Sequence, residues 1–206
     1  MSRKIGFVFT FAASVLLITA TVNAGKYNRV LKIGDSAPDW HNLAGVDDQK
    51  HSLGDYANAK AIVLCFTCNH CPVVQACEQR IIKLQAKYKE KGVQVVAVNI
   101  SNYDEDKLPK MKERSHSSGY NFPYLYDPTQ QIGKDFGAKI TPEFYILDQN
   151  RKIAYMGLMD DNQLNGFQVK KHYLQEALDA VLAGKTPERK ETNTRGGGCG
   201  IQYERR

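Results

Sequence analysis

The chain has 206 residues, of which 42% are hydrophobic and 24% charged, and its formal net charge is +6 at pH 7. This length and composition are typical of one globular domain with its own core, and they exclude a chain that is disordered over its bulk. The positive charge is moderate and no basic block alternates with aromatic residues, so we expect no nucleic-acid partner. The five cysteines are an odd number, which argues against a framework made only of structural disulfides.

The first 24 residues differ from the rest of the chain. Basic residues precede an apolar run, Ile5 to Val22, and small residues lead up to Ala24. This order is typical of a secretory signal peptide, here predicted to be cut near Ala24. A retained membrane anchor is the alternative, because the run approaches the ~18 to 20 residues that span a bilayer. We therefore expect a signal peptide at 1–24 and a mature protein that is periplasmic or secreted, without stable membrane insertion.

The first half of the mature chain predicts a strand, a helix and a second strand. Continuous apolar runs at 61–66 and 93–100 are typical of strands buried on both faces. Between them, apolar residues from Val73 to Tyr88 recur at three- and four-residue steps, which predicts an amphipathic helix that ends before Gly92. This order predicts a parallel pair of strands with a right-handed crossover.

The second half predicts more elements of both kinds. In chain order they are a charged helix at 104–116, a strand at 121–127, a short helix at 129–136, a hairpin at 143–157 and a last helix at 172–182. One domain therefore covers 25–184. Residues 185–206 are polar and contain a glycine-rich stretch, which predicts a flexible C-terminal tail.

Two cysteines, Cys68 and Cys71, lie where the first strand gives way to the helix. Cysteines separated by two residues on a first helical turn have α-carbons roughly 5 to 6 Å apart, a distance that a disulfide spans. Because a helix N-terminus stabilises a thiolate, we expect the pKa of Cys68 to fall below its free value of about 8.5. Cys68 is then the exposed nucleophile, and Cys71 is the resolving thiol.

The neighbours of the dithiol are predicted to modulate it. A protonated His70 would stabilise the reduced thiolate and make the disulfide more oxidising. Pro72 suits an early helical position, where its missing N–H costs little. Cys65 and Cys77 fall in the buried strand and on the inward helix face, so we expect both to be core side chains.

Cys199 is a possible third redox thiol. The flexible chain between Gly184 and Cys199 has a reach of roughly 20 Å, comparable with the radius of a domain of this size. Cys199 could therefore reach the dithiol. The alternative is a solvent-exposed thiol on the tail.

Three features of the sequence together resemble the thioredoxin superfamily. They are the dithiol at a strand-to-helix junction, the strand 93–100 that follows, and Ile140-Thr141-Pro142 directly before a strand. The resemblance implies an α/β thioredoxin-like fold with a mixed central sheet flanked by helices. It also implies that Pro142 is cis and faces the dithiol, so that the backbone of Thr141 is presented to a bound partner strand.

Other segments are similar to the redoxin branch of that superfamily, which includes peroxiredoxins and exported thiol-disulfide oxidoreductases. They are Ile33 to Pro38, the inserted helix 104–116 and Asn121-Phe122-Pro123, and the tail around Cys199 is similar to that of a peroxiredoxin-like subgroup. The branch adds an N-terminal extension and an inserted helix to the fold.

The chain departs from true peroxiredoxins at the dithiol. Their peroxidatic cysteine corresponds to the second thioredoxin cysteine and lies three residues after a Thr or Ser. Here Cys68 lies three residues before Cys71, and Thr67 is one place too early. The hydroxyl that would help to bind peroxide is missing or misplaced, which argues against efficient peroxidase activity.

The leading functional prediction is an exported thiol-disulfide oxidoreductase without a cofactor. Its partners would be protein or small-molecule thiols and disulfides and a redox partner protein. A thiol peroxidase is the first alternative. A copper-handling protein resembling the exported chaperones of copper enzymes is the second, although those place three residues between their cysteines. We expect no metal, because the second cysteine pair of a usual zinc site is absent beside His70 and Cys77.

Overall fold

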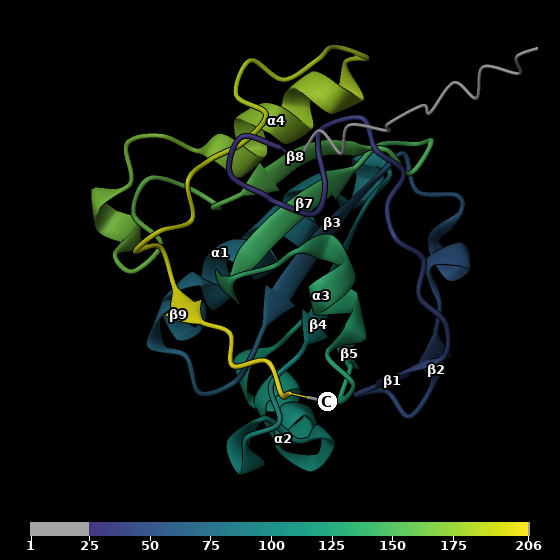
Figure 1. Cartoon of the computed structure of the whole chain (residues 1–206), viewed down its shortest axis with the longest axis vertical. Coiled ribbons are helices and arrows are strands. Elements are labelled where there is room, and N and C mark those ends of the chain that lie inside the picture. Colours follow the sequence, from purple (N-terminus) through teal and green to yellow (C-terminus); the bar gives the residue numbers. More distant parts are fainter. Residues whose placement is uncertain (1–24, 206) are drawn as a thin grey trace, which may run out of the picture.

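The computed structural model describes residues 25–205, which form a central sheet with helices on both faces (Figure 1). The sheet has the strand order β2-β1-β5-β4-β3-β7-β8. Its strands are β1 (Leu43–Gly45), β2 (Lys50–His51), β3 (Ala61–Thr67), β4 (Val93–Asn99), β5 (Tyr124–Tyr126), β7 (Glu143–Leu147) and β8 (Ile153–Gly157). A separate two-stranded sheet consists of β6 (Ile140–Thr141) and β9 (Cys199–Gly200).

The α-helices are α1 (Pro72–Tyr88), α2 (Leu108–Ser118), α3 (Gln131–Phe136) and α4 (Tyr173–Leu182). Short 3₁₀ helices lie at Leu53–Tyr56, Lys89–Lys91, Asp104–Asp106 and Gly166–Gln168. The predicted order of strands and helices is therefore present. The charged helix predicted from residue 104 begins later, at Leu108, because Pro109 lacks an N–H and suits the first helical turn.

The sheet is mixed, as predicted. β3 pairs in parallel with β4, and β4 with β5, whereas β7 is antiparallel to both β3 and β8. The sequence did not predict the short strands β1 and β2 of the N-terminal extension, which extend the sheet beyond β5. Too few apolar residues repeat in such short strands to give a periodic signal.

Two apolar clusters lie on opposite faces of the sheet. Ala61, Val63 and Cys65 of β3 belong to a cluster that includes residues of α1, α2 and α4. The alternate residues Ile62, Leu64 and Phe66 belong to the other cluster, with residues of α3 and the N-terminal extension. Because successive side chains of a strand point to opposite faces, the wholly apolar β3 forms the centre of a three-layer α/β structure. The predicted thioredoxin-like fold class is confirmed.

The prediction of a flexible tail needs correction. After α4 the chain runs back along the domain, and Thr192 N donates to the Met156 carbonyl of β8 at 3.1 Å. It then pairs with β6 as β9 and continues past α3, as the yellow trace of Figure 1 shows. Through residue 205, the tail is thus a packed part of the structure. The polar composition gave no sign of this, because the contacts are made largely by backbone atoms.

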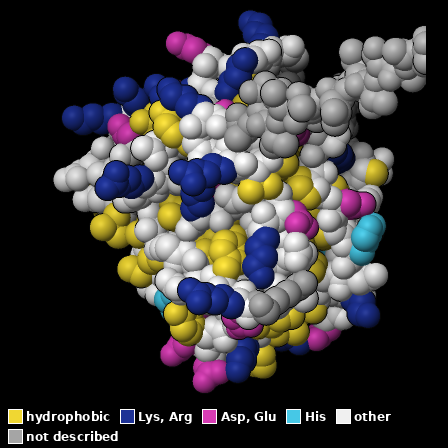
Figure 2. Space-filling model, viewed as in Figure 1, with side chains coloured by type: hydrophobic (Ala, Val, Ile, Leu, Met, Phe, Trp, Pro, Cys, Tyr) yellow, Lys and Arg dark blue, Asp and Glu magenta, His cyan; other side chains and the backbone are white. Residues whose placement is uncertain are grey.

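The predicted signal peptide, 1–24, lies outside the described residues. Within residues 25–205, no helix has the length and apolar character needed to cross a membrane. On the face shown in Figure 2, lysine and arginine side chains are interspersed with acidic and apolar ones.

Candidate functional site

The dithiol lies in the loop between β3 and α1. β3 ends at Thr67, Cys71 is the N-cap residue of α1, and Pro72 is the first helical residue. Pro72 therefore occupies the predicted position, where no helical hydrogen bond needs its N–H. The junction places Cys68 and Cys71 at the carboxyl end of the central strand, beside β6.

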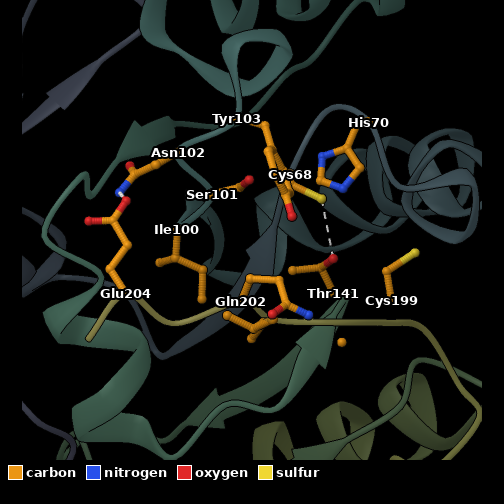
Figure 3. A pocket seen from close by; sticks show the side chains of 12 residues that line it. Cys68, His70, Ile100, Ser101, Asn102, Tyr103, Thr141, Cys199, Gln202 and Glu204 are labelled. Carbon is orange, nitrogen blue, oxygen red and sulfur yellow. Dashed lines mark hydrogen bonds between the residues drawn. The ribbon is translucent and has the colours of Figure 1, made fainter.

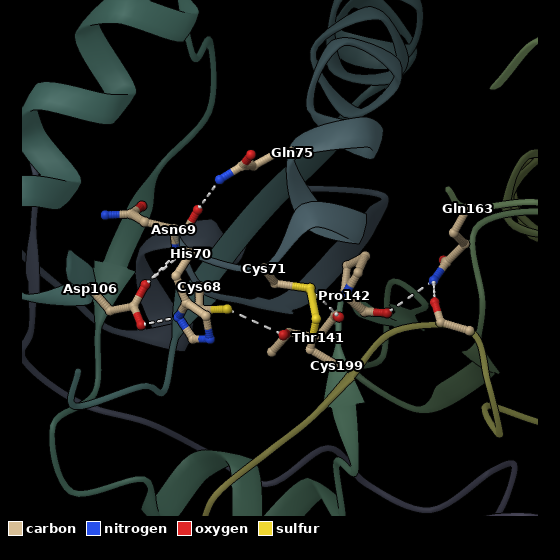
Figure 4. Close-up of a disulfide and its surroundings, with 11 residues drawn as sticks. Cys68, Asn69, His70, Cys71, Gln75, Asp106, Thr141, Pro142, Gln163 and Cys199 are labelled. Carbon is tan, nitrogen blue, oxygen red and sulfur yellow. Dashed lines mark hydrogen bonds and ion pairs between the residues drawn. A yellow bond between two sulfur atoms is a disulfide. The ribbon is translucent and has the colours of Figure 1, made fainter. Parts of the chain in front are cut away.

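The disulfide of the structure joins Cys71 to Cys199 across 128 residues of sequence, with α-carbons 6.2 Å apart (Figure 4). Cys68 is a free thiol, as are Cys65 and Cys77. The closed pair predicted from the Cys68-x-x-Cys71 spacing is thus not the one present. The sequence indicated that Cys68 and Cys71 could bond and that Cys199 could reach them, and the structure confirms that Cys199 reaches the dithiol. Which pair closes depends on the packing of the tail, which spacing does not describe.

Thr141 contacts both sulfur atoms of the dithiol. Its Oγ1 lies 3.2 Å from Cys68 Sγ, and its carbonyl oxygen lies 3.3 Å from Cys71 Sγ. The Thr141–Pro142 peptide bond is cis, as the resemblance implied. The backbone edge expected to receive a partner strand is present, and β9 of the same chain occupies it.

The Cys68 thiol is not the exposed, acidic group that the sequence predicted. Its residue is only 2% exposed, and α1 begins four residues later, at Pro72. Burial raises the pKa of Cys68 to about 11, because a thiolate loses its solvation there. The Thr141 hydroxyl opposes this shift, and the Asp106 carboxylate adds to it. The backbone N–H groups of Cys71 and His70 also lower the pKa, but burial outweighs them.

Asp106 is a site residue that the sequence prediction missed. Its fully buried carboxylate accepts hydrogen bonds from Asn69 N at 2.5 Å, His70 N at 3.1 Å and Ser101 Oγ at 2.6 Å. It also lies 2.5 Å from His70 Nδ1. The carboxylate thus fixes the loop between the two cysteines. Residues 104–106 were predicted to be part of a charged helix, and nothing in that pattern singled out one carboxylate for burial.

The interaction with Asp106 changes the electrostatics expected of His70. The His70 imidazole is partly exposed but bonds directly to the buried Asp106 carboxylate, so a positive charge on His70 would not be isolated beside the thiol. The imidazole ring also packs edge-on against Tyr103, with ring centroids 5.1 Å apart. The proposed modulation of Cys68 by His70 therefore involves a His-Asp pair rather than a single cation.

Cys68, His70 and Asp106 are also the group of described residues with the geometry to hold a metal ion. Their ligand atoms lie within 4.8 Å of one another. A thiolate, an imidazole and a carboxylate are a donor set that suits zinc or copper. This is the geometric basis for the copper-handling alternative, although the His70 and Asp106 atoms already bond to each other.

A cavity of about 300 Å³ opens beside the free thiol (Figure 3). Its lining includes Cys68 and His70 from the dithiol loop, Thr141 of β6, and the tail from Cys199 to Gln202. A molecule in this cavity would therefore meet Cys68 and the tail disulfide together. Cys65 and Cys77 are fully buried in the core, as predicted.

A dithiol at a strand-to-helix junction, next to a cis-proline loop on a mixed sheet, defines a protein of the thioredoxin superfamily. The redoxin family model matches residues 32–171, so the chain belongs to the redoxin family. It is 31% identical over 171 residues to "Thiol-disulfide oxidoreductase ResA" of Oceanobacillus iheyensis, covering 78% of this chain and 86% of that protein.

Solved structures agree with this assignment. An uncharacterized conserved protein from Geobacillus kaustophilus is 37% identical with a TM-score of 0.78, covering 86% of this chain and 95% of that one. A putative thiol:disulfide interchange protein DsbE from Chlorobium tepidum is 28% identical with a TM-score of 0.59, covering 74% and 99%. These similarities confirm the predicted redoxin branch and the general class of oxidoreductase enzyme.

Proposed function

We propose that the protein is an exported thiol-disulfide oxidoreductase whose reacting sulfurs are those of Cys68 and Cys71. The observation that carries this proposal is the packing of Cys68, Cys71 and Cys199 in one small cluster beside Thr141. Three sulfurs in such a cluster can exchange one disulfide among them without an external oxidant. The apolar segment 1–24 supports export to a periplasm or the cell exterior, where disulfides persist.

We assign the two cysteines roles opposite to those predicted from the sequence. Cys71 already bonds a third cysteine, so it occupies the position of the sulfur that forms a mixed disulfide with substrate. Cys68, the neighbouring free thiol, is then the group that resolves this bond. In the resolving step the Cys68 thiolate attacks Cys71 Sγ, the substrate sulfur leaves as a thiolate and takes up a proton, and a Cys68–Cys71 disulfide remains.

The experiment compares Cys68→Ser and Cys71→Ser with the wild type in the reduction of insulin by dithiothreitol. We expect Cys71→Ser to fall to the rate of dithiothreitol alone, because no mixed disulfide can form. Cys68→Ser combined with Cys199→Ser should accumulate the mixed disulfide between Cys71 and substrate, which mass spectrometry detects, because both cysteines that could attack it are gone. Cys65→Ala is the control for loss of a buried thiol. A Cys71→Ser variant with the wild-type rate would disprove the proposal.

A thiol peroxidase is the second candidate, favoured by one observation. The resemblance implied that Cys71 occupies the peroxidatic position. Its disulfide to the distant Cys199 is the bond that a peroxidatic cysteine would form with a resolving cysteine. Cys68, however, stands where a peroxiredoxin has its threonine or serine. Stopped-flow measurement of peroxide consumption separates the candidates, since a rate no faster than that of free cysteine eliminates the peroxidase.

A further inference from the structure

The C-terminal strand lies where the fold offers a backbone edge to an incoming chain. β9 is antiparallel to β6, with Thr141 opposite Cys199 and Ile140 opposite Gly200. Ile201 N donates to the Lys139 carbonyl at 3.0 Å and extends this pairing. Main-chain bonds of this kind are how an extended peptide adds to an exposed strand edge, with alternate side chains setting the register. This register places Cys199 within bonding distance of Cys71, and the two form the disulfide.

The glycines before Cys199 allow the close approach of the tail. A Cβ atom on Gly198 would lie under 3.0 Å from the Thr141 carbonyl oxygen, and one on Gly197 under 3.0 Å from Leu158. A Cβ on Gly200, in the same strand, would meet nothing within 4 Å. Glycine is thus required at Gly198, where the neighbour is backbone, whereas at Gly197 a Cβ would need the Leu158 side chain to move.

Two buried glutamines hold the tail on either side of β9. Gln163 Nε2 donates to the Gly197 carbonyl at 2.5 Å and lies 3.3 Å from the Pro142 carbonyl oxygen. Gln130 Nε2 donates to the Gln202 carbonyl at 2.9 Å, and its Oε1 accepts from Glu204 N at 2.8 Å. Each side chain would lose a hydrogen-bond partner if the tail were absent, and buried amides are normally satisfied. The domain is therefore built to receive this segment.

We propose that the C-terminal strand is an internal substrate of the enzyme, and that Cys199 is a third catalytic cysteine that takes the place of a substrate cysteine. This inference rests on the thiol-disulfide exchange proposed above. The Cys68 thiolate attacks Cys71 Sγ, a Cys68–Cys71 bond forms as the Cys71–Cys199 bond breaks, and Cys199 leaves as a thiolate that takes up a proton. One disulfide is exchanged for another, so no oxidant or reductant is consumed.

Release of Cys199 would determine which substrates can enter. While the tail is bonded, β9 occupies the β6 edge, and a polypeptide cannot pair there. The tethered Cys199 also competes with any free cysteine at a high effective concentration. The substrate that displaces it is an extended chain with a cysteine opposite Thr141.

Peptide mapping tests the bond directly. Oxidised protein is alkylated in acid and cut with trypsin, which leaves four cysteines in the peptide 61–80 and Cys199 in the peptide 196–205. We expect the wild type to give these two peptides joined by a disulfide. Cys199→Ser should instead give 61–80 with an internal Cys68–Cys71 disulfide. If the wild type gives the internal disulfide and no joined pair, the inference is wrong.

A matched pair of variants tests docking without changing a cysteine. Gly198→Ala should reduce the joined pair, because its Cβ would collide with the Thr141 carbonyl, whereas Gly200→Ala should keep it. Gly198→Ala and Cys199→Ser should both reduce insulin about tenfold faster than the wild type, since the edge is then free. Unchanged rates in both variants would overturn the inference. If those rates are unchanged but Cys71→Ser still abolishes insulin reduction, only the inference about the tail is wrong. If Cys71→Ser keeps the wild-type rate, the proposed function itself is wrong.

Discussion

At the scale of single residues, burial decides the state of the Cys68 thiol. The start of a helix near a cysteine favours its thiolate, and the backbone N–H groups of His70 and Cys71 do act in that direction. Yet the side chain is almost wholly removed from water, and the Asp106 carboxylate adds a repulsive charge. The Cys68 thiol is therefore weakly acidic, so little of it is the thiolate that could attack the disulfide between Cys71 and the tail.

The pH dependence of Cys68 alkylation checks this conclusion. In the oxidised protein, reaction with iodoacetamide should rise about tenfold per pH unit below the pKa of about 11, because only the thiolate reacts. Thr141→Val removes a hydrogen bond that lowers the pKa, so it should slow the reaction at pH about 8. Thr67→Val is the control, since its hydroxyl is not among the groups that shift this pKa. A rate that levels off near pH 7 would contradict burial as the dominant cause.

At the scale of elements, a buried carboxylate of α1 fixes α2, the helix that follows Asp106. Arg114 of α2 donates to Glu78 through Nε at 2.6 Å and through Nη2 at 2.8 Å, and Tyr120 donates to it at 2.6 Å. Glu78 is 6% exposed, so these bonds replace the water that the carboxylate has lost. α2 is thereby held against the helix that begins at the dithiol.

Neutralising that carboxylate should destabilise the protein. Glu78→Gln leaves Arg114 with a neutral partner, and we expect the free energy of unfolding to fall by about 2 to 3 kcal/mol. This loss is smaller than that for breaking a fully buried ion pair, because Arg114 is partly exposed. Glu113→Gln removes the exposed pair with Lys110 on the same helix and should change stability by less than about 0.5 kcal/mol. Urea denaturation of both variants measures the difference. Equal losses would show that burial of the pair does not matter.

At the scale of the whole molecule, the site joins segments that are far apart in the sequence. The dithiol loop, Asp106, the Thr141–Pro142 turn and Cys199 meet at one end of the sheet (Figure 4), where the tail pairs with Thr141 and bonds Cys71. The turn is held by Glu143, whose buried carboxylate accepts from Lys139 N at 2.8 Å and from Ile140 N at 3.3 Å. Burial raises the pKa of Glu143, so its charge opposes folding.

The pH dependence of global stability should show this charge. Because the folded pKa of Glu143 is raised, the folded chain holds the proton more tightly than the unfolded chain, and stability is lost as pH rises above the unfolded pKa of about 4.3. The free energy of unfolding of the wild type, relative to Glu143→Gln, should therefore fall as pH rises above about 4.3, until the pH exceeds the raised folded pKa. Exposed Glu90 gives the control, and Glu90→Gln should show no such trend. A relative stability that rises with pH would reverse the assigned sign.

Much of the fold follows from patterns along the chain. The apolar run of β3, the helical period of α1 and the turn between β7 and β8 are local features, and the structure has each of them where the sequence predicts it. Cys68 and Cys71 were also found by a local signal, their two-residue spacing, whereas Thr141 and Pro142 were found through the thioredoxin resemblance. Such patterns involve residues close together in sequence, so they can be recognised without the tertiary structure.

The sequence by itself determined the elements, the dithiol and the redoxin resemblance. Only the tertiary structure decided that Cys71 bonds Cys199, that Cys68 is buried, and that Asp106 lies beneath the loop. These outcomes depend on which side chains exclude water from the Cys68 sulfur and on which distant strand pairs with the edge of β6. Both are set by packing between segments remote in the chain, where spacing and composition carry no information.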